Sequence, residues 1–393
     1  MRLMAVSTSC LVDVNRAVYR HLAIDHKIEL HLVVPVRPKI ARAHGEISSI
    51  DSEPFPVTTL ELVGPHPRLE RAKGLKALIQ SWKPSHLVLE FDPATLLALD
   101  AAQASRHLNV SLAVITIENQ PRHFVREAFK AVRSAQLQIV FGGLIAWWLL
   151  RSVRHRIQHV FTVCQDGTNV MGQLGFAGRI VKVPLGFDTH LFFPQPSERI
   201  AATRQRLGLQ STVIAYFGRL VREKGIDLLL QSLSTLRDLR WQFLIDKFSI
   251  YRSSYEVQLQ SQIQALGLTN RVVYFDAPHS QIPDFMNAVD IVVLPSISTP
   301  KYKEQYGRVI PEAMGCGKVV VGSQSGAIPE VIGEAGFVFP EGDVAKLGEV
   351  LRYLLTAPEA ELDSIRIKAA ERARTQLSAA RQAEIMYSTL RGI

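Results

Sequence analysis

Residues 212–230 read TVIAYFGRLVREKGIDLLL, which is an apolar run, a basic turn with two glycines, and the start of an amphipathic segment. An apolar strand that passes through a short turn into a helix is typical of a parallel sheet covered on both faces. The alternation continues downstream through QFLI, VVYF, IVVLP and KVVVGS, and it occurs upstream from RLMAVST to SLAVITI. The sequence therefore predicts an α/β protein with two doubly wound domains.

A proline-interrupted stretch separates the two series. Residues 188–200, DTHLFFPQPSERI, contain two prolines that interrupt both strand and helix periodicity. We therefore predict an N-terminal domain at residues 1–190 and a C-terminal domain at 200–375. Residues 376–393 read as a helix that either closes the second domain or crosses back to the first. In such folds the active site is expected in the cleft between the domains, at the carboxyl ends of the strands.

Composition excludes several classes of protein. The 393 residues are 47% hydrophobic and 21% charged, which is typical of a globular chain and not of a collagen-like, coiled-coil or disordered one. The three cysteines are far apart and form no CxxC pair, which favours a reducing compartment without structural zinc. The start of the chain lacks the apolar stretch of a signal peptide, so a cytoplasmic location is expected.

The net charge of +9 comes mainly from the first half of the chain. Residues 1–190 hold 22 basic and 15 acidic residues. Such an excess suits nucleic acid, an anionic membrane or an anionic substrate. No DNA-binding motif and no basic tail accompanies it, so nucleic acid is not expected as a partner.

The turn after the strand at 212–217 offers a site for an anion. Gly218 lets the backbone approach a ligand, and the helix that begins near Ile226 presents free N–H groups. Arg219 and Lys224 add two cations, which together would suit a diphosphate. The alternative is an ordinary surface loop with basic residues, because Gly-Arg after a strand is weak evidence by itself.

A pair of carboxylates eight positions apart is more specific. Glu304 lies in the loop after IVVLPS, and Glu312 lies at the start of the next helix. A carboxylate accepts two hydrogen bonds from vicinal hydroxyls, so two carboxylates would hold two diols. The chain between them offers backbone N–H groups to phosphate at Tyr306, Gly307, Arg308 and Val309. Glu312 alone could merely complement a helix dipole, but that reading leaves Glu304 and Gly307 unexplained.

These segments resemble the retaining GT-B glycosyltransferases of family four, which transfer sugars from nucleotide-sugar donors. EQYGRVIPEAMGCGKVVVGSQSGAIPEVI, at 304–332, is similar to the paired-glutamate segment of that family and the glycine loop after it. FGRLVREKGIDLLL, at 217–230, is similar to its diphosphate-binding turn, and VPLGFDTHLFFP, at 183–194, to the close of its first domain.

The resemblance implies a GT-B fold, with two Rossmann-like domains facing across a cleft, and retention of the anomeric configuration. It implies that Glu312 holds the ribose, Glu304 the donor sugar, and Arg219 with Lys224 the diphosphate. We also expect an acceptor against the N-terminal domain, either a sugar or a lipid-linked compound. The product would belong to glycan, polysaccharide or glycolipid biosynthesis.

Three positions depart from the family pattern. The turn after the first strand, residues 9–16, contains no glycine, and Asp246 begins the turn after QFLI where the family has a glycine pair. After SLAVITI, where many relatives place a histidine, this chain has Glu118. Glu118 either orients an acceptor hydroxyl as a catalytic residue, caps a helix, or pairs with Arg122 four residues on.

No Asp-x-Asp motif occurs, which argues against a metal-dependent glycosyltransferase. Fixed cations and helix dipoles would then neutralise the departing diphosphate, and no metal or other cofactor is expected. Two alternatives stay open on the same fold. One is a sugar-nucleotide epimerase, and the other is a degenerate homologue that binds nucleotide without turnover.

Residues 122–156 combine charge with apolar surface. Arg122, Arg126, Lys130 and Arg133 recur at helical spacing. The uncharged run 134–150 follows with Trp147 and Trp148, and then three more basic residues close the segment. Such a segment suits peripheral attachment to the anionic inner face of a membrane. The alternative is a solvated helix followed by a buried core helix.

Overall fold

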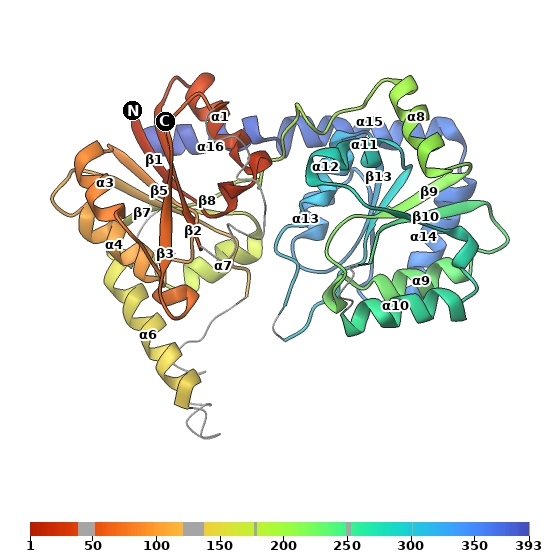
Figure 1. The fold of residues 1–393 in the computed structure, drawn as a ribbon, viewed down its shortest axis with the longest axis horizontal. Helices are drawn as coiled ribbons and strands as arrows, with labels where there is room; N and C mark the ends of the chain where they lie inside the picture. The colour runs from red at the N-terminus through yellow and green to blue at the C-terminus, as the bar shows by residue number, and fades with distance from the viewer. Residues whose placement is uncertain (38–51, 121–136, 177–178, 249–252, 301, 393) are drawn as a thin grey trace. The chain divides into compact units, whose positions relative to one another are not determined.

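The computed structural model describes residues 1–37, 52–120, 137–176, 179–248, 253–300 and 302–392. The chain divides into unit 1, which contains residues 1–186 and 379–393, and unit 2, which contains residues 187–378. In each unit a central sheet is covered by helices on both faces, as Figure 1 shows.

Unit 1 is built on a sheet in the order β4-β3-β2-β1-β5-β6-β7-β8. Its strands are β1 (Arg2–Val6), β2 (Glu29–Val36), β3 (Val57–Val63), β4 (Arg71–Ala72), β5 (His86–Leu89), β6 (Ser111–Thr116), β7 (Ile157–Thr162) and β8 (Arg179–Lys182). All neighbours pair parallel except β3 and β4. The central strand β1 is in register with both neighbours, so that Leu3 lies opposite Leu30 and His86.

The helices of unit 1 bury both faces of this sheet. They are α1 (Ala17–Ile24), α3 (Leu75–Trp82), α4 (Leu96–Ala104), α6 (Leu137–Val153), α7 (Gln165–Gln173) and α16 (Ala379–Arg391). One core cluster contains Tyr19 of α1 and Met386 of α16, and the other contains Ile79 of α3 and Leu149 of α6. The C-terminal helix α16 therefore completes the core of the unit in which the chain begins.

Unit 2 has a six-stranded parallel sheet in the order β11-β10-β9-β12-β13-β14. Its strands are β9 (Thr212–Tyr216), β10 (Trp241–Asp246), β11 (Val272–Phe275), β12 (Ile291–Leu294), β13 (Val319–Ser323) and β14 (Phe337–Phe339). Its helices are α8 (Ser197–Leu207), α9 (Ile226–Ser234), α10 (Ser254–Ala265), α11 (Ile282–Asn287), α12 (Val309–Gly315), α13 (Ile328–Ile332), α14 (Val344–Thr356) and α15 (Glu359–Gln376).

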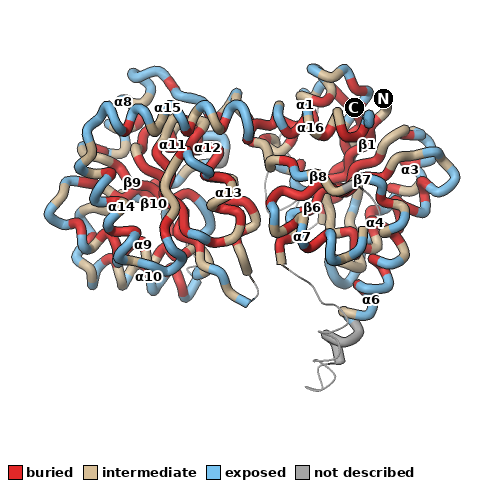
Figure 2. The backbone as a smooth tube through the Cα atoms, turned by 180° about the vertical axis from the view of Figure 1, so that it is seen from behind, coloured by how far each residue is buried: buried red, intermediate tan, exposed pale blue. Residues whose placement is uncertain are grey.

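The central strands of unit 2 are buried on both faces, as the red segments in Figure 2 show. Helices α9, α10 and α14 cover one face, and α12, α13 and α15 cover the other. This double cover explains why the strands read as continuous apolar runs instead of alternating ones.

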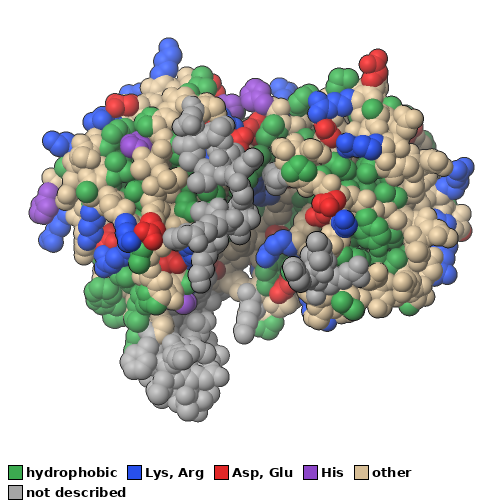
Figure 3. Space-filling model, viewed as in Figure 1, with side chains coloured by type: hydrophobic (Ala, Val, Ile, Leu, Met, Phe, Trp, Pro, Cys, Tyr) green, Lys and Arg blue, Asp and Glu red, His purple; other side chains and the backbone are tan. Residues whose placement is uncertain are grey.

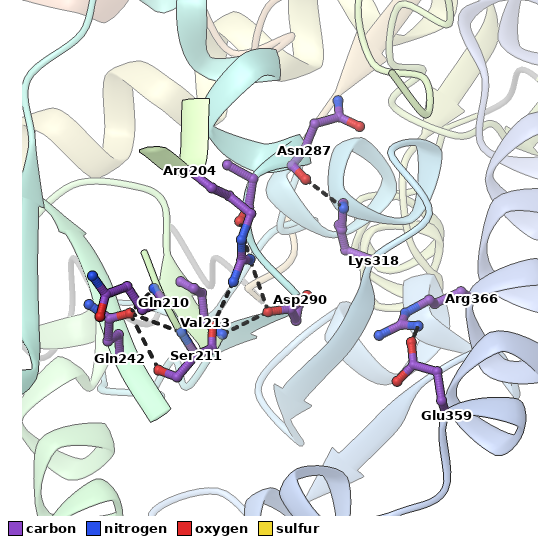
Figure 4. A network of polar contacts seen from close by, with 11 residues as sticks. Arg204, Gln210, Ser211, Val213, Gln242, Asn287, Asp290, Lys318, Glu359 and Arg366 are labelled. Carbon is purple, nitrogen blue, oxygen red and sulfur yellow. Dashed lines mark hydrogen bonds and ion pairs between the residues drawn. The ribbon is translucent and has the colours of Figure 1, made fainter. Parts of the chain in front are cut away.

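The amino-terminal edge of this sheet is held by Asp290, the residue before β12 (Figure 4). Its carboxylate accepts hydrogen bonds from the Val213 N–H at 2.8 Å and from Arg204 at 3.3 Å. Arg204 of α8 also donates to the carbonyls of Ser211 and Ala288. Helix α8 is thereby fixed at the amino ends of the strands, which is the edge opposite their carboxyl ends.

The proline-interrupted stretch at 188–200 packs on unit 2. The N–H of Gln195 donates to Asn287 at 3.0 Å, and the Gln195 side chain donates to Asp284 at 2.7 Å. Its prolines interrupt regular structure, but their neighbours bind α11. The compact unit therefore begins at residue 187, before the predicted position of 200.

Helix α6 has one buried and one exposed apolar face. Ala146, Leu149 and Val153 are buried, whereas Trp147 and Trp148 are 43% and 54% exposed. The run 134–150 is thus neither wholly core nor wholly surface over its described side chains. No helix among the described residues is long and apolar enough to cross a membrane.

Candidate active site

A pocket of about 630 Å³ lies at the carboxyl edge of the unit 2 sheet. The chain runs from β9 outward through β10 and β11, then returns to the other side of β9 as β12. The strand order therefore reverses between β9 and β12, where doubly wound sheets bind their ligands. The predicted binding residues on the pocket wall are Gly218, Arg219, Lys224, Glu304, Gly307, Arg308, Val309 and Glu312.

The turn after β9 is locked against the segment that follows β12. Residues 222–224 form one 3₁₀ turn that ends at Gly225, whose φ is 62°. A Cβ atom on Gly225 would lie 2.1 Å from the carbonyl oxygen of Pro295, so no other residue fits without movement. The Ile297 N–H also donates to the Glu223 carbonyl at 2.8 Å. This close approach brings Lys224 beside Glu304.

Three donors converge on one oxygen of Glu304. Its Oε2 accepts hydrogen bonds from Lys224 Nζ at 2.5 Å, Ser296 Oγ at 2.7 Å and Tyr302 OH at 2.9 Å. The backbone is held as well, since a Cβ on Gly326 would lie only 1.9 Å from the Glu304 carbonyl oxygen. The carboxylate is therefore fixed in position before any ligand binds.

The electrostatic surroundings keep Glu304 ionised. Burial by itself would raise the pKa of Glu304, but the charge of Lys224 and the hydrogen bonds from Lys224, Ser296 and Tyr302 bring the pKa below its usual value. The ammonium of Lys224 is in turn paired with this carboxylate, and Arg219 and Arg308 are further cations on the same wall.

Glu312 has a different environment. It lies in the first turn of α12 and is 8% exposed. Burial raises its pKa to about 7, while the charge of Arg308, whose NH2 lies 3.7 Å from Oε1, opposes that rise. Near neutral pH this carboxyl changes its protonation state readily, and a ligand that donates hydrogen bonds to it would favour the ionised form.

Tyr306 and Glu118 are not among the described residues that line this pocket. The side chain of Tyr306 is 3% exposed and packs into the core of unit 2, so the pocket wall takes only 307–309 from the predicted run. Glu118 belongs to unit 1, where it follows β6. Burial and the charge of Asp92 raise the pKa of Glu118, and the charge of Arg68 lowers it. Its predicted partner Arg122 lies outside the described residues.

Sequence reasoning missed two residues that hold Glu304. Ser296 follows the apolar strand β12 after one proline, and Tyr302 precedes Glu304 by two positions. A hydroxyl directly after a buried strand, in the loop that carries the carboxylate, was the available signal. Asp246, noted in sequence because it stands where a glycine pair was expected, ends β10 and lines the pocket. Burial raises its pKa, and a hydrogen bond from the Lys247 N–H opposes the rise.

Comparison with known proteins bears on the fold and the class of enzyme. Residues 200–373 match the family model of Glycosyl transferases group 1. The chain is 25% identical over 325 residues to the 2-deoxystreptamine glucosyltransferase of Streptomyces kanamyceticus, covering 77% of this chain and 80% of that protein. It is 33% identical over 183 residues to a GDP-mannose-dependent monoacylated alpha-(1-6)-phosphatidylinositol monomannoside mannosyltransferase of Corynebacterium glutamicum, covering 45% of this chain and 47% of that protein.

A solved structure with a similar fold is that of the Anabaena protein HepE in complex with UDP and glucose. Its TM-score is 0.72, with 20% sequence identity over the full length of both chains. The two doubly wound units, together with the family match, define a glycosyltransferase of the GT-B fold. Residues 200–373 match the group 1 glycosyltransferases, and the GT-B fold and the glycosyltransferase class predicted from sequence are confirmed.

Proposed function

We propose that this protein transfers a sugar from a nucleoside diphosphate sugar to an acceptor hydroxyl, with retention of the anomeric configuration. The bond from the anomeric carbon to the diphosphate oxygen breaks, and the bond to the acceptor oxygen forms on the same face. The departing phosphate oxygen takes the acceptor proton. The observation that carries the proposal is the fixed, ionised Glu304 beside Lys224 at the switch point of the unit 2 sheet.

Four charged groups on the pocket wall have a part in this reaction. Glu312 accepts hydrogen bonds from the ribose hydroxyls, and Glu304 accepts them from the donor sugar. Arg219 and Lys224 stabilise the charge that develops on the diphosphate, and Lys224 also aligns Glu304. Positioning and charge stabilisation then supply the catalysis without a covalent nucleophile.

The test is a binding and turnover assay on the full chain with a panel of nucleotide sugars. UDP-sugars come first because the structural neighbour holds UDP, and GDP-mannose follows because a relative is named for it. Glu304→Gln should lower turnover at least tenfold, since one charged hydrogen bond contributes ~1.5 to 3 kcal/mol. Glu334→Gln, on an exposed residue of the same unit, is the matched control and should leave turnover unchanged.

Absence of nucleotide binding, or equal loss in both variants, would contradict the proposal. The products separate it from its alternatives. A transferase releases nucleoside diphosphate and glycosylates an acceptor, an epimerase returns an altered nucleotide sugar, and a degenerate homologue binds nucleotide unchanged.

We also propose that the reaction needs no metal ion. Arg219, Lys224 and Arg308 line the pocket where the diphosphate would lie, and fixed cations of this kind stabilise a departing phosphate. Activity should therefore persist in excess EDTA. Complete loss with EDTA, restored by magnesium or manganese, would contradict metal independence.

A further proposal concerns location, namely that unit 1 attaches peripherally to the cytoplasmic face of a membrane. Four exposed apolar side chains lie together on α6, and they are Leu144, Ile145, Trp147 and Trp148. The guanidinium of Arg151 lies 5.6 Å from the Trp147 ring centroid. Exposed hydrophobic side chains, drawn green, are visible at the lower left of Figure 3, in the region of α6. Tryptophan and arginine at one apolar surface suit an anionic lipid interface.

Vesicle co-sedimentation tests this location. Leu144→Gln/Trp148→Gln should reduce pelleting with phosphatidylglycerol vesicles, and the binding should weaken with salt because charge attraction is screened over ~8 Å at physiological ionic strength. Ile24→Gln/Ile367→Gln changes two exposed apolar residues elsewhere and should pellet like wild type. Equal pelleting of all three proteins would contradict the proposal. The predicted basic stripe at Arg122, Arg126, Lys130 and Arg133 lies outside the described residues.

A further inference from the structure

A second pocket, of about 470 Å³, lies at the carboxyl edge of the unit 1 sheet. Here the strand order reverses between β1 and β5. The pocket takes Thr8 from the turn after β1, Arg37 from the end of β2, and Phe91 from the turn after β5. It therefore occupies the place in this sheet where doubly wound folds bind ligands.

One wall of this pocket is apolar. Val36, Leu62, Phe91 and Leu97 contribute to it. Leu62 and Phe91 pack against the core beneath but are only partly buried, so part of each side chain remains at the pocket. Such a wall gains free energy from contact with an apolar group and offers nothing to a ligand made only of hydroxyls.

The positive and negative charges of the described pocket residues balance one another. Arg37 pairs with Glu70 through two hydrogen bonds, of 2.6 and 2.9 Å. Arg68 lies 3.5 Å from Asp92. The ring Nδ1 of His66 accepts a hydrogen bond from the Arg68 N–H at 3.3 Å. The described residues of the pocket thus carry no net positive charge with which to hold a phosphate.

We propose that this pocket receives the acceptor, and that the acceptor is an uncharged compound joining a hydroxyl-bearing group to an apolar group, as in an alkyl or aryl glycoside. The proposal rests on the transferase function proposed above. Asp92 accepts hydrogen bonds from acceptor hydroxyls, and the wall at Leu62 and Phe91 contacts the apolar part. A free sugar lacks the second contact, and a sugar phosphate meets Glu70 and Asp92 without an unpaired arginine to balance its charge.

Binding to the full chain tests the proposal independently of turnover. The probes are n-octyl glucoside, galactoside and mannoside below their micelle concentrations, the three free sugars, and the three sugar 6-phosphates, followed by ligand-observed NMR. At least one octyl glycoside should bind about tenfold or more tightly than its free sugar, since even one methylene in an apolar pocket is worth ~10 to 200-fold. Preference for a sugar phosphate, or equal binding of glycoside and free sugar, would overturn it.

Two variants locate the binding. Leu62→Asn should lower octyl glycoside affinity to that of the free sugar, whereas Val63→Asn, on the exposed neighbouring residue of β3, should not. Equal effects would mean that the octyl chain binds another apolar surface, such as α6, and would overturn the proposal. Asp92→Asn keeps the shape but leaves Arg68 without this carboxylate, so it should raise affinity for a sugar 6-phosphate several-fold. An unchanged phosphate affinity would contradict the charge argument.

Donor binding is measured in the same samples. Nucleotide affinity in unit 2 should be unaffected by Leu62→Asn and Asp92→Asn. If none of these proteins binds nucleotide, the proposed transferase function is contradicted. If octyl glycoside affinity is unchanged by Leu62→Asn, only the acceptor proposal is contradicted.

Discussion

The turn after β1 and the turn after β9 hold the same place in their sheets but are built in opposite ways. After β1, the fully buried Arg16 donates from Nε to the Cys10 carbonyl at 2.8 Å and from NH1 to Glu53 at 3.2 Å. After β9, the buried Tyr216 donates from its OH to the Arg219 carbonyl at 2.8 Å, and no charged residue of 217–225 is buried. Gly218 and Gly225 both adopt positive φ there.

The difference shows two ways in which the carboxyl edge of a parallel sheet can be built to bind a ligand. A guanidinium that satisfies the carbonyls of its own turn closes that turn on itself, and ligands then meet only the side chains around it. A glycine turn leaves its backbone open to the ligand. Under the proposed function, unit 2 therefore offers backbone and fixed charge to a donor, while unit 1 offers side chains to an acceptor. Side chains change by substitution without altering the backbone, so acceptor preference should be easier to alter than donor chemistry.

The strongest test of the unit 2 turn is Lys224→Met. The change removes a cation from the pocket and leaves Glu304 buried without its charged partner, so the pKa of Glu304 should rise. We expect kcat/KM to fall about 10³-fold, the upper range for loss of one charge-stabilising donor. Initial rates of nucleoside diphosphate release provide the measurement. Lys346→Met, at an exposed position, should match wild type, and a loss below tenfold in Lys224→Met would contradict its placement in the site.

The corresponding test of the unit 1 turn is Arg16→Met. Two backbone carbonyls lose their donor, and Glu53, whose side chain is 1% exposed, keeps only Arg20 as an arginine partner among the described residues. The free energy of unfolding should fall by about 3 kcal/mol, the lower end for breaking a buried ion pair, because Arg20 still donates to Glu53. Urea unfolding measures the change. Nucleotide binding at unit 2 should persist, and its loss would mean that the two turns are not independent.

A comparison of two glycines tests how tightly the turn after β9 packs against the segment after β12. Gly208 and Gly225 share a positive φ, but only Gly225 meets a carbonyl oxygen where a Cβ would stand. Gly208→Ala should cost ~1 to 2 kcal/mol from backbone conformation alone. Gly225→Ala should cost about 2 kcal/mol more because of overpacking. Thermal unfolding of the two variants gives the difference, and equal costs would show that the approach to Pro295 is not tight.

A pH-dependent effect is expected at Glu312. Its pKa of about 7 in the folded protein exceeds its usual value of 4.5, so the folded state binds more protons between these values. The stability of the ligand-free protein should therefore fall as pH rises from 4.5 through 7. Glu312→Gln removes this dependence and should unfold at a higher temperature than wild type at pH 8, with the difference vanishing near pH 4.5.

The affinity for the nucleotide donor should change with pH in the opposite direction to stability. Wild-type nucleotide binding should strengthen from pH 6 to 8 as Glu312 ionises, and Glu312→Gln should bind at least tenfold more weakly at pH 8, without this dependence. Calorimetry at two pH values measures both. Unchanged affinity in the variant would remove Glu312 from the ribose site.

Sequence alone predicted the parts of the candidate site that depend on local spacing. Glu304 and Glu312 share one strand-loop-helix segment, and Gly218 with Lys224 shares another, so strand order sufficed to place both at one edge. The convergence of Ser296 and Tyr302 on a single oxygen of Glu304 was not predictable, because it depends on how the loop folds back.

The rest of the fold was harder to predict for physical reasons. The apolar run in α6 favoured core and membrane equally, since hydropathy does not report which side of a helix faces the sheet. The structure buries Leu149 and exposes Trp148 on neighbouring positions. The missing glycines after β1 were visible in sequence, but their replacement by the buried Arg16 was not, because charged residues are rarely buried unless paired.

Because α16 belongs to unit 1, the sequence of unit 1 is begun first during synthesis but is completed last. Ala379, Ala383, Met386 and Leu390 complete a core that begins with Leu3. At ~5 to 20 residues per second, the ribosome spends about 10 to 40 s on the intervening residues 187–378 before it makes α16. The whole sequence of unit 2 is therefore available before that of unit 1. Until α16 is made, the core of unit 1 lacks the side chains that this helix contributes. A nascent chain stalled after residue 378 should contain a folded unit 2 and a protease-sensitive unit 1.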